Sequence, residues 1–412
     1  MKILNVTIVG GGMIVNDQIL PSIYHLQRTG LVDKIDICAL NTPPLRALAE
    51  SPDFKKSFPG QEFTPHPALS ESPDKNFPDL FKKVIAGMEK YNVVVISLPD
   101  QLHYMGLKEA LKNDQHVLCV KPLVLEYEKA VEIEKEAYEK GLFVGIEYHK
   151  RFDRRSLMAK RHYELGQYGD FIMGEAKLIE PYYYRSSNFQ NWFTVDKTDP
   201  FVYVGCHYVD LVQFITKLKP VEVAVRGIKG KFPNGNEGFI WSIGWVAYEN
   251  GAILSVTNGL GYPDDGAGSN EQCLSMYFEG EGKTGHLKHN DQFRGVEYSF
   301  LEGIGPGGSQ FNYVNPDYFK YVPWEGEGYK PVGYGFDSIK ANLEAINRIV
   351  NTAGSLEARQ AMIKEINDKG IIATPANSSM NELVIEAARV SILDGGIPVE
   401  IVHGNKPHVK KK

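Results

Sequence analysis

The fold is decided by the stretch Ile3-Leu4-Asn5-Val6-Thr7-Ile8-Val9-Gly10-Gly11-Gly12-Met13-Ile14-Val15. Its apolar, β-branched first half is typical of a buried parallel strand. The glycines allow a tight turn, and the residues after them open a segment with helical spacing, whose N–H groups and positive dipole end favour a pyrophosphate. The pattern G-x-G-x-x-(G/A) therefore predicts a dinucleotide site at Gly10 and Gly12, although Val15 stands where a small residue is usual. The alternative is a glycine-rich turn that binds no nucleotide.

Length and composition indicate an ordinary globular protein. A chain of 412 residues is long enough for two domains with full cores. It is 43% hydrophobic and 23% charged, with a net charge of −6. That balance argues against a nucleic acid or a membrane surface as the main partner. We also expect no membrane span, because no apolar run reaches the length that a bilayer requires.

The cysteines are Cys38, Cys119, Cys206 and Cys273, and none of them forms a C-x-x-C pair. We therefore expect buried free thiols rather than disulfides or a metal site. Free thiols are typical of a reducing compartment, and no signal peptide is visible. The sequence thus predicts a cytoplasmic protein.

Apolar runs at 34–40, 93–98, 116–120 and 142–147 alternate with helical patterns, whereas 52–78 is typical of a loop. This alternation predicts βαβ units and a parallel sheet, with ligands bound outside the carboxyl ends of the strands. We expect the cofactor-binding residues at those ends to be Gly10, Gly12, Met13, Ile14, Asn41, Arg46, Leu98, Pro99, Gln101, His103, Val120 and Lys121.

Asn41 stands near the end of the second strand, where a dinucleotide site usually carries an acid that binds the ribose. An asparagine can still hydrogen-bond a ribose, but it lacks the charge that repels a 2′-phosphate. The choice between NAD and NADP is therefore open. The alternative role of Asn41 is that of a helix N-cap.

Two stretches carry a resemblance to a known family. Val94-Val95-Ile96-Ser97-Leu98-Pro99-Asp100-Gln101-Leu102-His103 resembles "V-I-x-T-P-x-x-x-H", and His116-Val117-Leu118-Cys119-Val120-Lys121-Pro122 resembles "H-V-x-x-E-K-P". Both belong to the glucose–fructose oxidoreductase and inositol dehydrogenase family (Gfo/Idh/MocA). Residues 388–401 are similar to the closing run of the same family. The family's glutamate before the lysine is Val120 here, and that glutamate is thought to help place the nicotinamide.

A second informative stretch, residues 201–217, reads as a helix. Tyr203, His207 and Asp210 fall at i, i+4 and i+7, so they share one face. Gly205-Cys206-His207-Tyr208-Val209-Asp210 matches the family's G-x-H-x-x-D. The resemblance implies that His207 transfers the proton of a substrate hydroxyl, with Lys121 beside it. Asp210 can orient the imidazole and stabilise its charged form. The alternative is a structural helix histidine, and Tyr203 replaces an aspartate that many members carry.

Tyr148-His149-Lys150-Arg151-Phe152 is similar to the family's "Y-H-x-R-F", which tends to line the substrate crevice. The resemblance therefore implies a substrate-binding set. Its members are Lys121, Tyr148, His149, Arg151, Tyr203 and His207.

The rest of the chain is rich in strand patterns, at 221–228, 239–248, 252–258, 273–279 and 285–288. Asn250-Gly251 is a strong hairpin signal. The alternation of Phe239, Trp241, Ile243 and Trp245 predicts one aromatic face on an open, mostly antiparallel sheet. Family members pair subunits through that face, so we expect a homodimer or homotetramer.

These observations predict an α/β Rossmann dinucleotide-binding domain at residues 1–124. An α+β substrate-binding and oligomerisation domain with a large open sheet follows at 125–412. The expected activity is that of an NAD(P)-dependent dehydrogenase, with NAD slightly favoured. It would pass hydride to nicotinamide C4 from a secondary hydroxyl of a sugar, glycoside or cyclic polyol, with catalytic residues Lys121, His207 and Asp210. The alternatives are a redox-neutral glycosidase or lyase and a non-catalytic sensor of sugar or dinucleotide.

Overall fold

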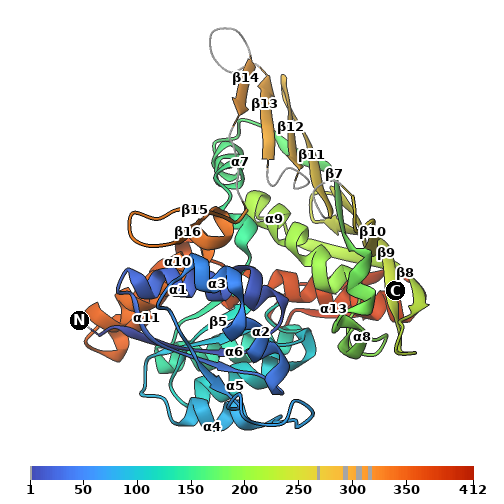
Figure 1. The fold of residues 1–412 in the computed structure, drawn as a ribbon. Coiled ribbons are helices and arrows are strands. Elements are labelled where there is room, and N and C mark those ends of the chain that lie inside the picture. Colours follow the sequence, from blue (N-terminus) through green and yellow to red (C-terminus); the bar gives the residue numbers. More distant parts are fainter. Residues whose placement is uncertain (1, 267–269, 291–295, 303–308, 314–317) are drawn as a thin grey trace. The chain divides into compact units, whose positions relative to one another are not determined.

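The computed structural model describes residues 2–266, 270–290, 296–302, 309–313 and 318–412 (Figure 1). The chain forms two compact units. Unit 1 comprises Met1–Leu123, Lys129–His149 and Tyr318–Asn377; unit 2 comprises Val124–Glu128, Lys150–Asp317 and Ser378–Lys412. Segments beyond residue 124 thus contribute to unit 1, and the domain division at 124 and 125 stays a prediction.

Unit 1 contains a parallel sheet of six strands in the order β3-β2-β1-β4-β5-β6, which confirms the predicted Rossmann class. The strands are β1 (Leu4–Val9), β2 (Val32–Cys38), β3 (Thr64–His66), β4 (Val93–Ile96), β5 (His116–Val120) and β6 (Val144–Glu147). The helical elements between them include short π- or 3₁₀-helices, which are labelled η. They are η1 (Val15–Ile19), α1 (Leu20–Arg28), α2 (Thr42–Glu50), α3 (Pro52–Ser57), α4 (Leu80–Ala86), η2 (Asp100–Leu102), α5 (His103–Lys112) and α6 (Tyr127–Lys140).

The strand order places the glycine turn at a ligand-binding position of the sheet. From β1 the chain runs outward to β2 and β3, then returns to β4 on the other side of β1. The carboxyl ends of β1 and β4 therefore form the topological switch point, where open α/β sheets bind their ligands. Gly10 follows β1 and Ser97 follows β4, and the Ser97 amide donates to the Val9 carbonyl at 2.8 Å.

The predicted loop at 52–78 is partly wrong, because it contains α3 and β3. The Ser51 hydroxyl caps α3 by accepting from the Phe54 amide at 3.3 Å. Phe54 and Phe58 are buried and pack on the ring of Tyr24. The proline- and serine-rich composition concealed this small apolar contact, which holds the segment on α1.

Unit 1 is completed by a segment that comes much later in the chain. It consists of β15 (Lys320–Pro323), β16 (Tyr329–Val332), α10 (Tyr334–Thr352) and α11 (Leu356–Lys369). Apolar residues of α10 and α11 share one core cluster with β1, β2 and α1. The Arg28 guanidinium lies between the rings of Phe58 (4.8 Å) and Trp324 (5.3 Å), so α1 holds the β15–β16 hairpin.

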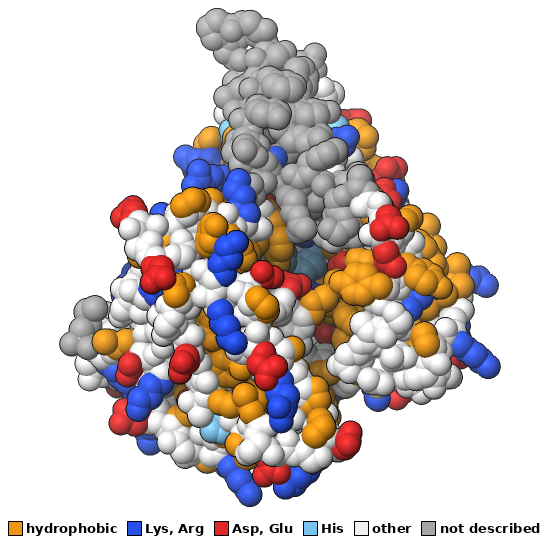
Figure 2. All heavy atoms as spheres, viewed as in Figure 1, with side chains coloured by type: hydrophobic (Ala, Val, Ile, Leu, Met, Phe, Trp, Pro, Cys, Tyr) orange, Lys and Arg blue, Asp and Glu red, His pale blue; other side chains and the backbone are white. Residues whose placement is uncertain are grey.

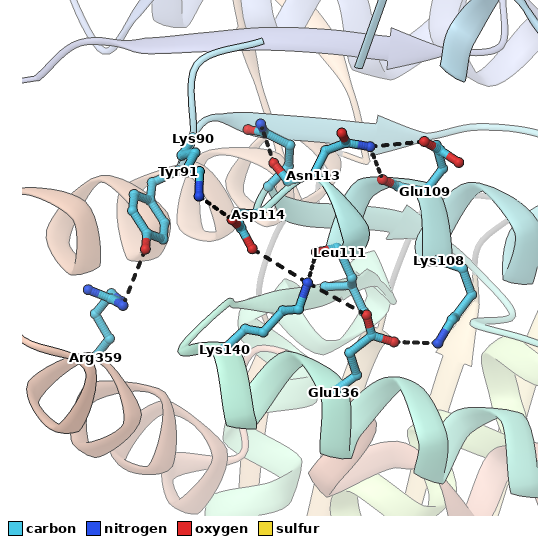
Figure 3. Close-up of polar contacts among 11 residues, drawn as sticks. Lys90, Tyr91, Lys108, Glu109, Leu111, Asn113, Asp114, Glu136, Lys140 and Arg359 are labelled. Atoms are coloured by element: carbon cyan, nitrogen blue, oxygen red, sulfur yellow. Dashed lines mark hydrogen bonds and ion pairs between the residues drawn. The ribbon is translucent and has the colours of Figure 1, made fainter. Parts of the chain in front are cut away.

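A polar network ties α5 to α6 at the surface of unit 1 (Figure 3). Lys140 donates to the Leu111 carbonyl at 2.7 Å and lies 3.4 Å from Asp114. Lys108 pairs with Glu136. Because these charges are partly exposed, each pair contributes at most about 1 kcal/mol. The network is therefore a structural brace for the helices that cover β4 and β5.

Unit 2 contains a sheet of ten strands in the order β14-β13-β12-β11-β7-β10-β9-β8-β17-β18. Its pairs are antiparallel except for β7 with β10, which confirms the predicted mostly antiparallel sheet. The strands are β7 (Asp170–Pro181), β8 (Pro220–Lys231), β9 (Glu237–Tyr248), β10 (Ile253–Tyr262), β11 (Glu271–Gly280), β12 (Lys283–Asn290), β13 (Val296–Glu302), β14 (Ser309–Tyr313), β17 (Val399–Val402) and β18 (His408–Lys411).

The helices of unit 2 precede or cover this sheet. They are α7 (Arg154–Glu164), η4 (Tyr182–Ser186), α8 (Phe189–Trp192), η5 (Phe201–Gly205), α9 (Cys206–Thr216) and α13 (Met380–Leu393). The short elements η3 (His149–Phe152) and α12 (Pro375–Ser378) lie where the chain passes between units. The Asn250-Gly251 turn joins β9 to β10 as predicted.

The prediction that Phe239 shares a face with Trp241, Ile243 and Trp245 is wrong. The pairing of β8 with β9 shifts between Ile228 and Lys229, which leaves Ile240 as an extra residue on β9. An extra residue of this kind reverses the faces of the residues beyond it. Phe239 is accordingly buried on the side where α13 packs, while Ile243 remains 58% exposed on the open face.

The visible surface carries mixed charges, with Lys and Arg side chains among Asp and Glu (Figure 2). Hydrophobic side chains gather at the right of the view, over the area that Figure 1 labels β10. Within the described ranges, no helix has both the length and the apolar character needed to cross a bilayer.

Candidate active site

The glycine turn of unit 1 has the geometry of a nucleotide-binding turn. Gly10 has φ +117°, and a Cβ atom there would lie 1.9 Å from the Ser97 carbonyl oxygen, so only glycine fits. A Cβ atom at Gly12 would meet nothing within 4 Å, which leaves the backbone open to a ligand. Met13 and Ile14 begin the helical segment at once, and first-turn N–H groups have no acceptor inside a helix.

Two polar atoms at the end of β4 indicate that this crevice takes a polar ligand. Ser97 Oγ and Gln101 Oε1 are buried, and neither has a hydrogen-bond partner in the described part of the chain. Leu98 and Pro99 lie between them and lead into η2. Buried polar atoms are rarely left unsatisfied, so a dinucleotide that supplies hydroxyl and phosphate groups fits these residues.

The end of β2 differs from the sequence prediction. Asn41 is the N-cap residue of α2 but makes no side-chain cap; its amide instead donates to Asn76 Oδ1 at 3.1 Å. Arg46 donates to the Leu69 carbonyl. Pro44 and Ala39 both lie beside the glycine turn, because their Cβ atoms are 3.3 Å and 3.4 Å from a Cβ built on Gly11. The contact of Asn41 with a ribose stays a prediction, and Ala39 is a second residue at this strand end that lies near the glycine turn.

His103 joins the ends of two strands. Its Nδ1 lies 2.7 Å from the Pro122 carbonyl oxygen and its Nε2 lies 2.8 Å from the Leu98 carbonyl oxygen, and the side chain is fully buried. Both ring nitrogens are thus engaged by the backbone, so a direct contact of the ring with a cofactor stays a prediction. The arrangement fixes the loop that carries Lys121 directly after β5.

Tyr148 and His149 follow β6, the neighbour of β5 in the sheet. The buried Val120 of β5 pairs in register with Glu147 of β6. Glu147 accepts a hydrogen bond from His149 Nδ1 at 2.9 Å. Glu147 was not among the residues singled out from sequence, and its place beside the strand that leads to Lys121 is a product of the pairing.

In unit 2, His207 lies on α9 and is 6% exposed. Gly205 allows this helix to approach β10, because a Cβ atom there would lie 2.6 Å from Asn258 Oδ1. Asp210 does not orient His207 as predicted from sequence. Its two oxygens accept from Arg151, at 2.8 Å from Nε and 2.5 Å from Nη2. The i+3 spacing placed Asp210 near His207, but a buried guanidinium provides the stronger, bidentate partner.

The Arg151–Asp210 pair is almost completely buried. Burial raises the pKa of the Asp210 carboxyl, and the Arg151 charge opposes that rise. The Phe214 ring lies 5.2 Å beneath the guanidinium. This pair holds η3 against α9, so Asp210 is placed to position the helix that carries His207.

Replacement of Arg151 by methionine is expected to destabilise the protein by about 3–5 kcal/mol, because it leaves the Asp210 carboxylate buried without its counter-ion. Urea unfolding followed by circular dichroism measures this loss. The double variant Arg151→Met/Asp210→Leu is the control, since it removes the unpaired charge and should recover much of the stability. Equal stability of the single variant and the unmodified protein would contradict the assignment.

Tyr203 is part of an aromatic cluster. Its ring lies 5.1 Å from Phe189, 5.7 Å from Trp192 and 5.7 Å from Phe193. Lys150, the buried cation that directly precedes Arg151, donates to Gln272 Oε1 at 2.9 Å and lies over the Tyr208 ring. A direct role of Tyr203 at a substrate stays a prediction.

The structure thus brings the candidate residues together in two groups. Unit 1 gathers the glycine turn, the end of β4, Lys121, Tyr148 and His149 at one edge of its sheet, and unit 2 gathers Arg151, Tyr203, His207 and Asp210 around α9. Within the described residues, no cluster of His, Cys, Asp or Glu is arranged to hold a metal ion.

Comparisons with known proteins find sequence similarity in the first part of the chain. The family model described as "Oxidoreductase family, NAD-binding Rossmann fold" matches residues 4–148. An uncharacterised oxidoreductase of Schizosaccharomyces pombe is 34% identical over 99 residues, which cover 24% of this chain and 27% of that protein. The 2,7-anhydro-N-acetylneuraminate hydratase of Escherichia coli is 29% identical over 77 residues, covering 16% and 21%. The chain therefore aligns with about a quarter of the length of these curated relatives.

Solved structures match over nearly the whole chain. Levoglucosan dehydrogenase, in complex with NADH and L-sorbose, has a TM-score of 0.66 at 17% identity, covering 98% of this chain and 100% of the other. The 3-ketoreductase KijD10 from Actinomadura kijaniata, in complex with NADP and TDP-benzene, has a TM-score of 0.62 at 14% identity, covering 95% and 98%. At these identities the likeness shows a shared fold.

Proposed function

We propose that this chain, whose residues 4–148 match the family model described as "Oxidoreductase family, NAD-binding Rossmann fold", is an NAD(P)-dependent sugar oxidoreductase of the Gfo/Idh/MocA family. Its substrate would be a sugar, glycoside or cyclic polyol that offers a secondary hydroxyl. The observation that carries this proposal is the glycine turn. Gly10, which no other residue could replace without a collision, the open Gly12 and the unsatisfied Ser97 Oγ and Gln101 Oε1 all lie at the switch point of the sheet.

Two residues would carry the chemistry. A nicotinamide dinucleotide, when bound, supplies the acceptor for the hydride of the carbinol carbon. Lys121 would hydrogen-bond the hydroxyl oxygen and stabilise the charge that develops there as the carbonyl forms. His207 would accept the hydroxyl proton. Asp210, through its pair with Arg151, would position the helix that carries His207.

A carbohydrate substrate is supported by the names of structural relatives, which include levoglucosan dehydrogenase. Tyr182 and Tyr183 are half exposed in η4 and offer ring faces of the kind that pack on a sugar. Four free cysteines, three of them buried, support a reducing, cytoplasmic compartment.

The test uses D-glucose, myo-inositol and methyl β-D-glucopyranoside with NAD and with NADP. The absorbance of reduced nicotinamide is followed alongside the carbonyl product. Stoichiometric formation of both supports the proposal. Absence of turnover with every pair, under conditions where the protein is folded, counts against it.

A redox-neutral reaction is the second candidate, and the relative named as a hydratase favours it. Such an enzyme would oxidise a glycoside transiently, eliminate a group, and return the hydride. It would release methanol from the methyl glycoside without net reduced nicotinamide. Measurement of both products separates the two candidates, because stoichiometric reduced nicotinamide excludes the redox-neutral route.

Because the Ala39 side chain carries no charge, we expect the protein to bind NADH and NADPH with similar affinity. Replacement of Ala39 by aspartate should weaken NADPH binding by at least about tenfold relative to NADH, because a carboxylate there repels the 2′-phosphate. Asn41→Asp is the matched control, since the Asn41 side chain points to Asn76. Fluorescence titration gives both dissociation constants. If Asn41→Asp weakens NADPH binding relative to NADH and Ala39→Asp does not, Asn41 is the residue that lies beside the ribose.

We also propose that the open face of the unit 2 sheet pairs two copies of the chain. Tyr277, Met173 and Ile253 form one exposed apolar row across β11, β7 and β10. Ile243 of β9 lies on the same face, opposite Thr257 of β10. Contiguous apolar surface of this kind marks interaction sites.

Ile243→Glu is expected to convert the oligomer to a monomer, because it places a charge in the apolar face. Light scattering after size exclusion measures the mass. Leu165→Glu is the control, since Leu165 is equally exposed but lies at the end of α7. A monomeric unmodified protein, or an Ile243→Glu protein of unchanged mass, would refute this interface.

A further inference from the structure

The carboxyl end of β6 carries a buried pair of an acid and an imidazole. Glu147 is 2% exposed and His149 is 8% exposed, and His149 Nδ1 lies 2.9 Å from Glu147 Oε2. Glu147 pairs in register with Val120, and the next residue of that chain segment is Lys121. The pair therefore lies at the same sheet edge as the proposed catalytic lysine and within the same unit.

The carboxylate is fixed at both oxygens. Gln18 Nε2 donates to Glu147 Oε1 at 2.8 Å and to the Gly335 carbonyl at 3.0 Å. The Tyr318 hydroxyl donates to Gln18 Oε1 at 2.6 Å. Gln18 lies in η1, the helical turn that follows the glycines. A chain of hydrogen bonds thus runs from the helix behind the nucleotide turn to the imidazole.

Glu147 has His149 as its ionisable hydrogen-bond partner. Among the described residues, no lysine or arginine forms an ion pair with Glu147. A carboxylate that bonds to one ring nitrogen of an imidazole stabilises the charged form of the ring when the other nitrogen takes up a proton. The pair therefore favours proton uptake by His149, which is the property that a general base requires.

The imidazole is also held in one orientation. Its ring centroid lies 5.0 Å from that of Tyr318 and 5.7 Å from that of Tyr334. With Nδ1 donating to Glu147, Nε2 is the nitrogen that accepts a proton. This is the arrangement in which a carboxylate sets the tautomer of a catalytic histidine. His207 lacks that arrangement with Asp210, whose oxygens are taken by Arg151.

We propose that His149, oriented by Glu147, is the residue of the oxidoreductase that accepts the substrate hydroxyl proton, in the place that the proposed function gives to His207. In the oxidation direction the O–H bond breaks and its proton passes to His149 Nε2. The hydride of the same carbon passes to the oxidised dinucleotide, and the electron pair of the O–H bond forms the carbonyl. Glu147 stabilises the imidazolium until the proton is released to water. The inference rests on the proposed function and assigns one of its steps to unit 1.

His149→Asn is the most informative variant. The asparagine amide can keep the hydrogen bond to Glu147 but offers no nitrogen in the place of Nε2. We expect kcat to fall by about 100-fold with the substrate found in the sugar panel, while the melting temperature and the NADH dissociation constant remain unchanged. His149→Ala should show the same fall and recover activity when imidazole is added. Glu147→Gln should lower kcat without rescue by imidazole.

His116→Gln is the matched control, because His116 is a fully buried histidine at the amino end of β5. It should leave kcat and the response to imidazole unchanged. Full turnover by His149→Asn, or a slow His149→Ala protein that imidazole does not rescue, overturns the inference and leaves the proposed function intact. If the unmodified protein reduces no dinucleotide, the proposed function and this inference fail together.

Discussion

Lys121→Ala is expected to lower kcat by about 100- to 1,000-fold, the range seen when one donor to a developing oxyanion is removed. The charge on the substrate oxygen grows as the carbinol carbon loses hydride, and Lys121 is the cation that directly follows β5 at the ligand edge of the sheet. The ring of His103 contacts the carbonyl of Pro122, the residue after Lys121, and the Leu98 carbonyl of the loop after β4. Steady-state kinetics with the best substrate of the panel measure the effect.

The same substitution should leave NADH binding within about threefold of its original value, because the proposed contact is with the substrate oxygen. Lys112→Ala is the control, since Lys112 lies exposed at the end of α5 in the same unit. It should keep full activity. A Lys121→Ala enzyme that turns over at the original rate would remove the lysine from the mechanism.

Gly10→Ala is expected to destabilise the protein by at least about 3 kcal/mol, because it combines a disfavoured positive φ with a backbone collision. The added Cβ would lie 1.9 Å from the Ser97 carbonyl oxygen and 2.7 Å from its carbon. Neither atom can move without parting β1 from β4, whose ends are joined by the Ser97 amide and the Val9 carbonyl. Urea unfolding gives the free energy of both proteins.

Gly12→Ala separates stability from ligand binding. A Cβ atom at Gly12 meets nothing within 4 Å, so its unfolding free energy should stay within about 0.5 kcal/mol of the original. Equal stability of Gly10→Ala and Gly12→Ala would mean that the turn is not built as described.

Most strands of the parallel sheet in unit 1 could be predicted because their signals are local, whereas β3, α3 and the place of Tyr318–Asn377 in this unit were not predicted. The buried strand β4 is a continuous apolar run, β1 is apolar at most of its positions, and the glycines that follow β1 mark the turn. The β9–β10 hairpin was likewise predicted from Asn250-Gly251. The bulge at Ile240 escaped prediction because it arises from the pairing of β8 with β9, which no short stretch encodes. Phe239 therefore faces the helices.

The sequence could predict candidate site residues that lie within one motif, but not the partners that packing brings to them. Spacing placed Asp210 one turn after His207, but its partner Arg151 lies 59 residues away in sequence and is revealed only by packing. The closeness of Ala39 to the glycine turn could not be predicted, because it depends on the path of the chain after β2. Glu147 was missed because its meaning comes from its register with Val120 on the neighbouring strand.

The central claim is that a nicotinamide dinucleotide binds over the glycine turn. Calorimetric titration of the unmodified protein and of Gly12→Ala with NAD, NADH, NADP and NADPH tests it most directly. We expect saturable binding of one dinucleotide per chain to the unmodified protein and at least about 100-fold weaker binding to an equally stable Gly12→Ala protein. Undiminished binding to Gly12→Ala, or no binding of any of the four to the folded unmodified protein, would contradict the claim.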